Sequence, residues 1–452
     1  MLTDIFGNDI SLDTIETRDE WDKLQLAFLA HAQVTPMHLS TVLNAAPEFA
    51  LGHAIKGLFY MMLGRRELVE TARDAYKDAR QALDDASATK RERDFVRALG
   101  FYLDGNPAQA RDVVQNILNA HPRDALAMKI VHAISFILGQ LAQMRHSIEE
   151  VLPTYDEGHA GYGYLMGCHA FALEETGAYA EAEKVGRKGM NYAVNDAWGL
   201  HAVAHVYDMT ANTSAGLKWL TEQEGAWAHC NNFGFHVWWH KALFLLDQER
   251  IDEVFALYDA KIRKEKTDDY RDISNATSLL SRLELEGIDV GNRWEELADL
   301  SENRTADGCL IFADLHYILA LVGGERDQAI RTMMSRINKD AQTANTEIAR
   351  VMADPGVAAA AGLEAFGEAN YELAFKNLAC ARSKMQLAGG SHAQRDVFER
   401  LTIDAGIRGG HFKEAKQILT ERKAKRGGAE DHYAAVRFEM LTNMERPDVI
   451  PH

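Results

Sequence analysis

The sequence predicts an all-α fold in which helix-turn-helix repeats stack into a right-handed superhelix. The 452 residues include only 8 prolines, which suits long uninterrupted helices. Strand signals are nearly absent, because no turn dipeptide is flanked by alternating apolar residues. Several segments repeat one pattern: a helix, a glycine break, and a second helix with an alanine shortly after the break. We therefore expect residues 1–452 to form a single continuous array.

The glycine breaks set the expected ends of the first helices. Gly64, Gly105, Gly139 and Gly177 mark four of them, and glycine ends a helix well because it tolerates the left-handed conformation. Their spacings of 41, 34 and 38 residues lie near the ~34-residue tetratricopeptide period. The sequence therefore predicts degenerate tetratricopeptide-like repeats with insertions.

Small and capping residues define the helices that follow the breaks. Ala110, Ala182 and Ala415 each lie a few residues into a second helix. A small side chain there lets two antiparallel helices cross closely. Asp124 follows a proline break and is typical of the residue that caps a helix N-terminus. We expect these alanines to be buried between paired helices.

The charge of the chain disfavours polyanionic partners. The sequence has 67 acidic and 49 basic residues and a formal net charge of −18, whereas phosphate binding needs a positive surface. The densest basic run, residues 413–426, is typical of a solvated helix face. We expect neither a nucleic acid nor a membrane surface as the partner.

The remaining composition suggests a reducing cytoplasm. No segment approaches the ~20 apolar residues of a membrane-spanning helix, and the first 17 residues do not resemble a secretory leader. The four cysteines form no C-x-x-C pair, which argues against a disulfide framework and a thiolate zinc site. A cytoplasmic protein is the expectation, and self-association through exposed ends of the array is left open.

The segment from 198 to 240 is the strongest candidate for a site. It contains two histidine pairs at helical spacing, His201/His205 and His236/His240. Residues four apart lie on one face of a helix, so each pair presents two imidazoles in one direction. If the two helices pack as an antiparallel pair, the four imidazoles converge, as ligands do in helix-bundle metal sites.

A divalent metal is one interpretation of these histidines. Asp208 lies three residues after His205 on the same stripe, and two imidazoles with a carboxylate suit zinc or iron. Ala202 stands where a metalloprotease helix of the H-E-x-x-H type has its glutamate, so that class of enzyme is excluded. The metal set that we consider is His201, His205, His236 and His240.

Three stretches within residues 159–262 resemble the tetratricopeptide repeat protein 38 family: "HAGYGYLMGCHAFALEETGAYAEAE", "NDAWGLHAVAHVYDM" and "WAHCNNFGFHVWWHKALFLLD". The resemblance runs along most of the chain and is weaker in the final third. It implies a tetratricopeptide-like helical repeat fold, but the biochemical role of the family is poorly defined. One departure is "TANTSAGLKWL", where an Asn-Thr-Ser run replaces the glycine break.

Our leading hypothesis is that residues 159–262 line a concave pocket, rich in histidine and tryptophan, that binds a small molecule or a peptide. Tryptophans would supply apolar walls, and histidine and asparagine would supply directed hydrogen bonds. The alternatives are a metal-assisted enzyme, such as a hydrolase or oxidoreductase, and a structural adaptor with an open groove. The expected ligand-binding residues are His201, His205, Asp208, Trp227, Asn231, His236, Trp238, Trp239 and His240, with Tyr162 and His169 as secondary candidates.

Overall fold

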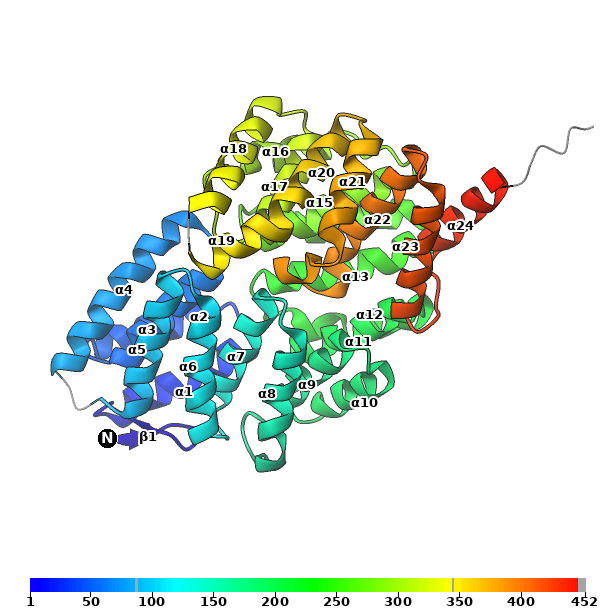
Figure 1. Ribbon diagram of the computed structural model, residues 1–452. Helices are drawn as coiled ribbons and strands as arrows, with labels where there is room; N and C mark the ends of the chain where they lie inside the picture. Colours follow the sequence, from blue (N-terminus) through cyan, green and yellow to red (C-terminus); the bar gives the residue numbers. More distant parts are fainter. Residues whose placement is uncertain (86–87, 344, 446–452) are drawn as a thin grey trace, which may run out of the picture.

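The computed structural model describes residues 1–85, 88–343 and 345–445 and is an array of α-helices (Figure 1). Over the described residues the only strands are the short antiparallel pair β1 (Leu2–Thr3) and β2 (Asp9–Ile10). The all-α prediction is confirmed. Residues 86–87, 344 and 446–452 of the predicted array lie outside the described part of the chain.

Consecutive helices pair as hairpins, and the first helix of each hairpin faces the interior. The inner helices are α1 (Ile15–Leu29), α3 (Ala50–Met62), α5 (Lys90–Leu103), α7 (Ala125–Ile137), α9 (Tyr162–Glu175), α11 (Ala197–Met209), α13 (Phe233–Asp247), α15 (Tyr270–Leu285), α17 (Ile311–Gly323), α20 (Val357–Gly367) and α22 (His392–Arg408). Their partners are α2 (Thr35–Ala45), α4 (Arg66–Asp85), α6 (Pro107–Ala120), α8 (Leu141–Val151), α10 (Tyr179–Gly189), α12 (Thr213–Glu222), α14 (Ile251–Leu257), α16 (Arg293–Glu302), α18 (Asp327–Thr343), α21 (Tyr371–Arg382) and α23 (Phe412–Lys425).

Shorter elements complete the array. The helices α19 (Glu347–Val351) and α24 (His432–Glu445) stand outside the hairpin pattern. Short 3₁₀-helices are η1 (Leu152–Thr154), η2 (Glu224–Trp227) and η5 (Met385–Ala388). Short π-helices are η3 (Tyr258–Ile262) and η4 (Met352–Gly356). None of the described helices is both long enough and apolar enough to span a membrane.

The predicted glycine breaks are confirmed. Gly64, Gly105, Gly139 and Gly177 all follow the first helix of a hairpin and have φ values of 60°, 76°, 63° and 84°. Only glycine adopts this left-handed conformation without strain from a Cβ atom. The breaks therefore reverse the chain between paired helices, as the repeat pattern predicts.

Non-glycine residues make the same turn elsewhere. The "TANTSAGLKWL" segment lacks a glycine break, and there Ala211 adopts φ = 51° between α11 and α12. Glu249, Glu325 and Ala369 do the same after α13, α17 and α20. The local turn geometry is thus kept although the residue type changes.

Packing between paired helices also follows the sequence pattern. Ala110, Ala182 and Ala415 are fully buried, and the Asp124 carboxylate accepts the Ala127 backbone N–H at 3.0 Å at the start of α7. The basic run 413–426 differs from the prediction in part. Its Arg422 and Arg426 are buried, because Asp431 of the loop before α24 pairs with Arg422 and Asp208 of α11 pairs with Arg426.

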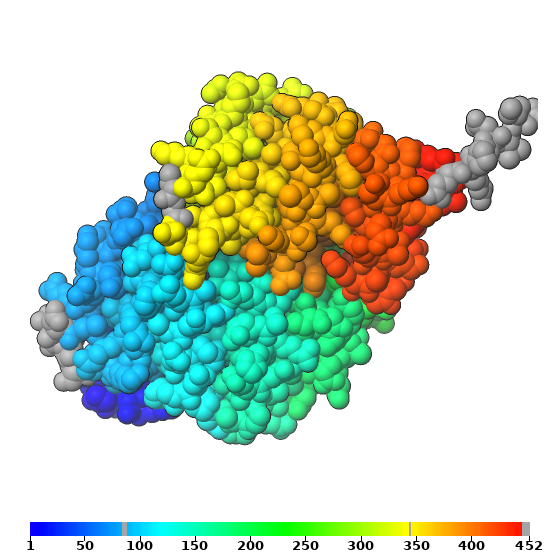
Figure 2. All heavy atoms as spheres, viewed as in Figure 1, coloured from blue at the N-terminus to red at the C-terminus, as the bar shows by residue number. Residues whose placement is uncertain are grey.

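The array curves until distant segments meet. Helix α22 packs against α11 and α15, and the Gln386 side chain donates to the Gly139 carbonyl at 2.7 Å. The backbone N–H of Asn231 donates to the His31 carbonyl at 2.9 Å. In Figure 2 the yellow and orange segments of the C-terminal half lie directly on the cyan and green segments of the N-terminal half. The inner helices are therefore gathered around one interior space.

Candidate functional site

A cavity of about 390 Å³ lies in that interior. Its walls come from the end of α1 and the start of α2, from α3, α7, α9, α11 and α13, from the starts of α15, α17 and α22, and from the loop before α22. We call it the chamber. The aromatic residues of its walls are Phe28, Phe59, Phe136, Phe171, Trp198, Phe233, Tyr270 and Phe312.

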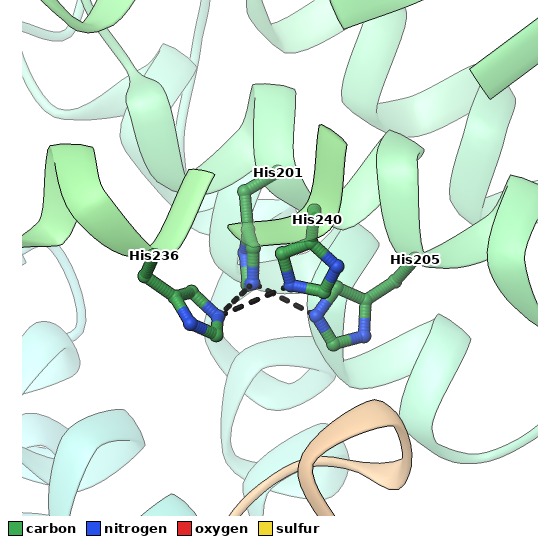
Figure 3. Close-up of side chains that lie close together, drawn as sticks. All are labelled: His201, His205, His236 and His240. Carbon is green, nitrogen blue, oxygen red and sulfur yellow. Dashed lines mark hydrogen bonds between the residues drawn. The ribbon is translucent and has the colours of Figure 1, made fainter. Parts of the chain in front are cut away.

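Four histidines meet at one wall of the chamber. His201 and His205 come from α11, and His236 and His240 come from α13 (Figure 3). The Nε2 atom of His201 lies 2.8 Å from that of His205 and 3.1 Å from that of His236, and the Nε2 atoms of His236 and His240 are 3.1 Å apart. One nitrogen from each ring lies within 4.8 Å of the other three. The predicted convergence is therefore present, and we call these residues the histidine cluster.

The two helices converge in a different way from the sequence expectation. Helix α12 forms the hairpin with α11, and α13 starts the next hairpin, so α11 and α13 are successive inner helices. Ring centroids pair His201 with His236 at 4.9 Å and His205 with His240 at 4.4 Å. The first histidine of α11 thus lies beside the first histidine of α13, and the second beside the second, as in helices that run in the same direction. The convergence therefore occurs without the antiparallel pairing on which the sequence argument made it conditional.

Close packing of α9 on α11 brings a carboxylate to the cluster. A Cβ atom on Gly167 would lie 1.8 Å from the Asp196 carboxylate, and one on Gly199 would lie 2.5 Å from it. Only glycine at these positions leaves room for the two helices and for the Asp196 cap of α11. About two turns further along α9, Glu174 reaches the Nδ1 atom of His205 at 3.3 Å.

The metal-free cluster cannot satisfy its own hydrogen bonds. A neutral imidazole nitrogen carries either one proton or one lone pair, so it takes part in one in-plane hydrogen bond. Four Nε2 atoms therefore make at most two bonds, yet three Nε2···Nε2 contacts are formed. The Nδ1 atoms of His201 and His240 are also buried without a partner. Buried polar atoms are normally paired, and a cation that takes the Nε2 lone pairs would resolve these contacts.

The outer nitrogens of two rings set their tautomers. His236 Nδ1 lies 2.9 Å from the Asn275 side-chain oxygen, and His205 Nδ1 faces the Glu174 carboxylate. A proton on each Nδ1 leaves the Nε2 lone pairs pointing into the cluster. Trp239 is fully buried and stacks on the His236 ring at a centroid distance of 5.2 Å, which holds that ring in place.

Electrostatics keep most of the cluster neutral. Burial holds the pKa of His201 and His240 well below the ordinary value and lowers the pKa of His236 to about 3. Burial also acts against the charged form of His205, but the Glu174 carboxylate outweighs it and raises the pKa. Burial raises the pKa of Glu174 in turn.

This arrangement suits a transition-metal ion. Neutral imidazole nitrogen is a preferred ligand of zinc, copper, iron and nickel, and an outer carboxylate or amide on the second nitrogen is the usual support. In a tetrahedral site with metal–nitrogen bonds of about 2.0–2.1 Å, the nitrogens lie about 3.4 Å apart. The observed contacts of 2.8–3.1 Å are shorter by only a few tenths of an ångström. A small outward shift of the rings therefore makes room for an ion.

The other predicted site residues from α11 and α13 lie elsewhere. The Asp208 side chain pairs with Arg426 at 3.2 Å and does not join the cluster, because Glu174 occupies that side of His205. Trp227 packs edge-on against Trp238 at 5.2 Å, away from the chamber walls. Trp238 is covered on its outer side by Lys241 and Lys261. These tryptophans do not form the chamber walls.

Of the remaining predicted residues, one lines the chamber and two lie away from it. Asn231 lines the chamber, and its side chain also accepts the Phe233 backbone N–H at 2.9 Å. Tyr162 lies on the outer side of the array beside Lys188 and Tyr192. His169 is buried 3.4 Å from Glu149, and neither it nor Tyr162 borders the chamber. Of the expected ligand-binding residues, His201, His236 and Asn231 line the chamber.

Sequence reasoning missed four residues of the site, three of which come from other hairpins than the histidines. Glu174 and Asn275 support the cluster from α9 and α15, and Lys129 and Trp198 line the chamber from α7 and α11. Trp198 lies three residues before His201, so helical spacing alone could have placed it on the same face. Nothing local in the sequence marks the other three.

Comparisons with known proteins assign neither a family nor a role to this chain. No protein-family model matches the chain. Two solved structures resemble it: "Human IFIT1 dimer with m7Gppp-AAAA", at 12% sequence identity, and "Human IFIT1 dimer with PPP-AAAA", at 14%. Both alignments cover 97% of each chain, with a TM-score of 0.41. At these values the likeness carries no argument, and the helical-repeat fold rests on the hairpins of the structure itself.

Proposed function

We propose that this protein binds a small organic molecule in the chamber, beside a divalent transition-metal ion held by the histidine cluster. One observation carries the proposal. Four Nε2 atoms converge within 4.8 Å at the chamber wall and form more contacts than their protons can satisfy. A cation that accepts all four lone pairs removes this conflict.

The position of the cluster supports a link between ion and ligand. His201 and His236 line the chamber, whereas His205 and His240 are completely enclosed behind them. An ion between the four rings would therefore lie at the wall of the ligand site. Small-molecule sites are mostly apolar cavities with a few convergent polar groups, and the chamber fits this description.

Metal-assisted catalysis is the second candidate function. His201 and His236 favour this function, because an ion held beside them would lie at the chamber wall. There it would act as a Lewis acid on a bound molecule or activate a water molecule. A structural adaptor is the weaker alternative, since an adaptor groove requires no convergence of buried histidines at its wall. The formal charge of −18 argues for a small-molecule partner over a nucleic acid.

We also propose that the chain forms one domain, in which residues 159–262 supply one side of the chamber. The support is that α7, α15, α17 and the loop before α22 supply the other sides. We further propose that the chain belongs to the tetratricopeptide repeat protein 38 family. This proposal rests on the sequence segments around the histidine cluster that resemble that family.

The metal can be tested with protein purified without an affinity tag. We expect elemental analysis to find about one first-row transition-metal ion per chain. After removal of the ion by a chelator, Co²⁺ should restore one equivalent and give the visible d–d absorption of a nitrogen-coordinated site. The variant His205→Gln/His240→Gln should bind no ion and show no such band.

A matched variant separates coordination from folding. His169→Gln removes another buried histidine, which lies outside the cluster beside Glu149, and should keep full metal content. Circular dichroism and melting curves should show that all variants are folded. The proposal fails if the wild-type protein retains no ion at micromolar concentrations, or if the double variant binds Co²⁺ as tightly as the wild type.

A further inference from the structure

The charge of the chamber is opposite to that of the whole chain. The sequence carries 18 more acidic than basic residues, yet no aspartate or glutamate is among the chamber-lining residues. Lys129 and Arg271 both line it. The lining therefore has basic side chains and no acidic ones, although the protein as a whole is acidic. Such a cavity attracts anions.

Arg271 already has its counter-ion. Its guanidinium donates to the Asp269 carboxylate in a bidentate pair at 2.8 and 2.6 Å, and its backbone N–H donates to the same carboxylate. The charge of Arg271 is therefore balanced within the protein. Lys129 is the cation left for a ligand.

Lys129 is buried without an ion pair. Its residue is only 4% exposed, and no carboxylate oxygen of the described residues lies within ion-pair distance of its Nζ atom. Its Nζ atom lies 3.8 Å from the Cys168 sulfur and 4.7 Å from the centre of the Trp198 ring. Burial raises the pKa of Cys168 to about 11, so this thiol is neutral and does not balance the ammonium. A buried ammonium of this kind needs a negative partner.

Asp196 is the acidic group that interacts electrostatically with Lys129, but it is not that partner. Its carboxylate accepts the Gly199 backbone N–H at 3.1 Å as the cap of α11, and it does not border the chamber. Burial raises its pKa to about 7, so it carries only part of a negative charge near neutral pH. Lys129 lines the chamber, and no carboxylate of the described residues forms an ion pair with its ammonium.

The rest of the lining selects a ligand with an apolar body. Seven phenylalanine and tryptophan rings surround the space, together with Met62, Leu63, Ile137 and Leu310. Aromatic walls of this kind bury hydrocarbon or aryl groups. A phosphate would need several converging N–H donors, whereas one free ammonium matches the single charge of a carboxylate.

We infer that the chamber binds an apolar monocarboxylate, whose carboxylate pairs with Lys129 and whose alkyl or aryl body lies against the phenylalanine and tryptophan rings. This inference rests on the proposed use of the chamber as a ligand site. It goes further by naming the chemical class of the ligand and the residue that selects it.

Matched ligands that differ only in charge test the inference. We would titrate chelator-treated protein with 4-phenylbutyrate, 4-phenylbutanol and 4-phenylbutylamine by calorimetry, and repeat this with octanoate and octanol. The carboxylates should bind at least about tenfold more tightly than the alcohols, and the amine most weakly, because a desolvated ion pair adds to the apolar contact.

Two lysine variants identify the group responsible. Lys129→Met and Lys129→Gln should bind carboxylate and alcohol about equally, whereas Lys218→Met, at an exposed lysine of α12, should behave as the wild type. Circular dichroism would check that each variant is folded. Retention of the carboxylate preference in both Lys129 variants would overturn the inference.

The remaining outcomes separate this inference from the proposed function. Equal binding of alcohol and carboxylate by the wild type overturns the monocarboxylate class but leaves the chamber as a ligand site. Binding of none of the five compounds overturns both the ligand class and small-molecule binding in the chamber. The metal test is independent of either result.

Discussion

Two groups of buried polar side chains differ in whether their charges are matched. The first lies between α22, α23 and the start of α24, where Arg400 and Arg422 face Asp396 and Asp431. The second is the histidine cluster with Glu174 and the nearby Lys129. The first group is electrically neutral and hydrogen-bonded throughout, and the second is not.

Each arginine of the first group binds both aspartates. Arg422 lies 2.7 Å from Asp396 and 2.5 Å from Asp431, and Arg400 lies 2.7 Å and 3.0 Å from the same two carboxylates. Burial acts against the charged carboxylates, but the arginines outweigh it and hold the pKa of both well below the ordinary range. This network fastens the last helices together through matched charges.

The second group has opposite properties. The Nδ1 atoms of His201 and His240 are buried without a hydrogen-bond partner, and Lys129 has no ion pair. Burial, not a partner, dominates the pKa values of Asp196 and Glu174 and raises both. The comparison teaches that burial alone does not identify a site. The unmatched donors and acceptors distinguish a ligand-binding cluster from a structural one.

The largest expected effect comes from breaking the matched network. Asp396→Ala should lower the free energy of unfolding by about 3–5 kcal/mol, because two buried arginines lose a shared counter-ion. Urea unfolding monitored by circular dichroism measures this change. His240→Leu in metal-free protein should cost clearly less, because that ring has an unpaired Nδ1. Equal losses for the two variants would show that the clusters do not differ in this way.

A smaller effect should appear in the pH dependence. Burial raises the pKa of Asp196 from 3.8 to about 7 in the folded protein. The folded state therefore binds the proton more tightly, and the stability contributed by this proton is complete below about pH 4 and is lost as the pH rises through 7. Asp396, whose pKa is lowered, contributes in the opposite direction and loses its contribution as the pH falls.

Asp196→Asn isolates this contribution while keeping a residue that can cap α11. Between about pH 5 and pH 7, wild-type stability should fall by about 2 kcal/mol relative to the variant. Urea unfolding at several pH values measures the difference. Asp74→Asn, at an exposed aspartate, serves as the control and should show no such change. Parallel curves for wild type and Asp196→Asn would contradict the assignment.

The smallest effect concerns the unpaired ammonium. In ligand-free protein at about pH 6, where Asp196 is mostly protonated, Lys129→Met should raise the free energy of unfolding by about 1 kcal/mol. The reason is that a buried charge without a counter-ion is replaced by an apolar chain of similar length. Lys218→Met should leave stability unchanged. A loss of stability in Lys129→Met would place Lys129 with the structural charges of the first group.

Much of the fold follows from local patterns. Glycine breaks, buried alanines and the Asp124 cap act within one hairpin, so a single sequence shows them, and the structure confirms all three. Even where Ala211 replaces glycine, the turn is kept. Helical spacing likewise placed His201 with His205, and His236 with His240, on common faces.

The sequence by itself determined the helical hairpins and the two histidine pairs, because these depend on spacings of a few residues. Only the tertiary structure decided that the pairs meet between parallel inner helices, that Glu174 rather than Asp208 supports His205, and that Lys129 faces the chamber. The physical reason is that superhelical curvature, set by packing along the whole array, brings together side chains from α7, α9, α11 and α13 that no local pattern connects.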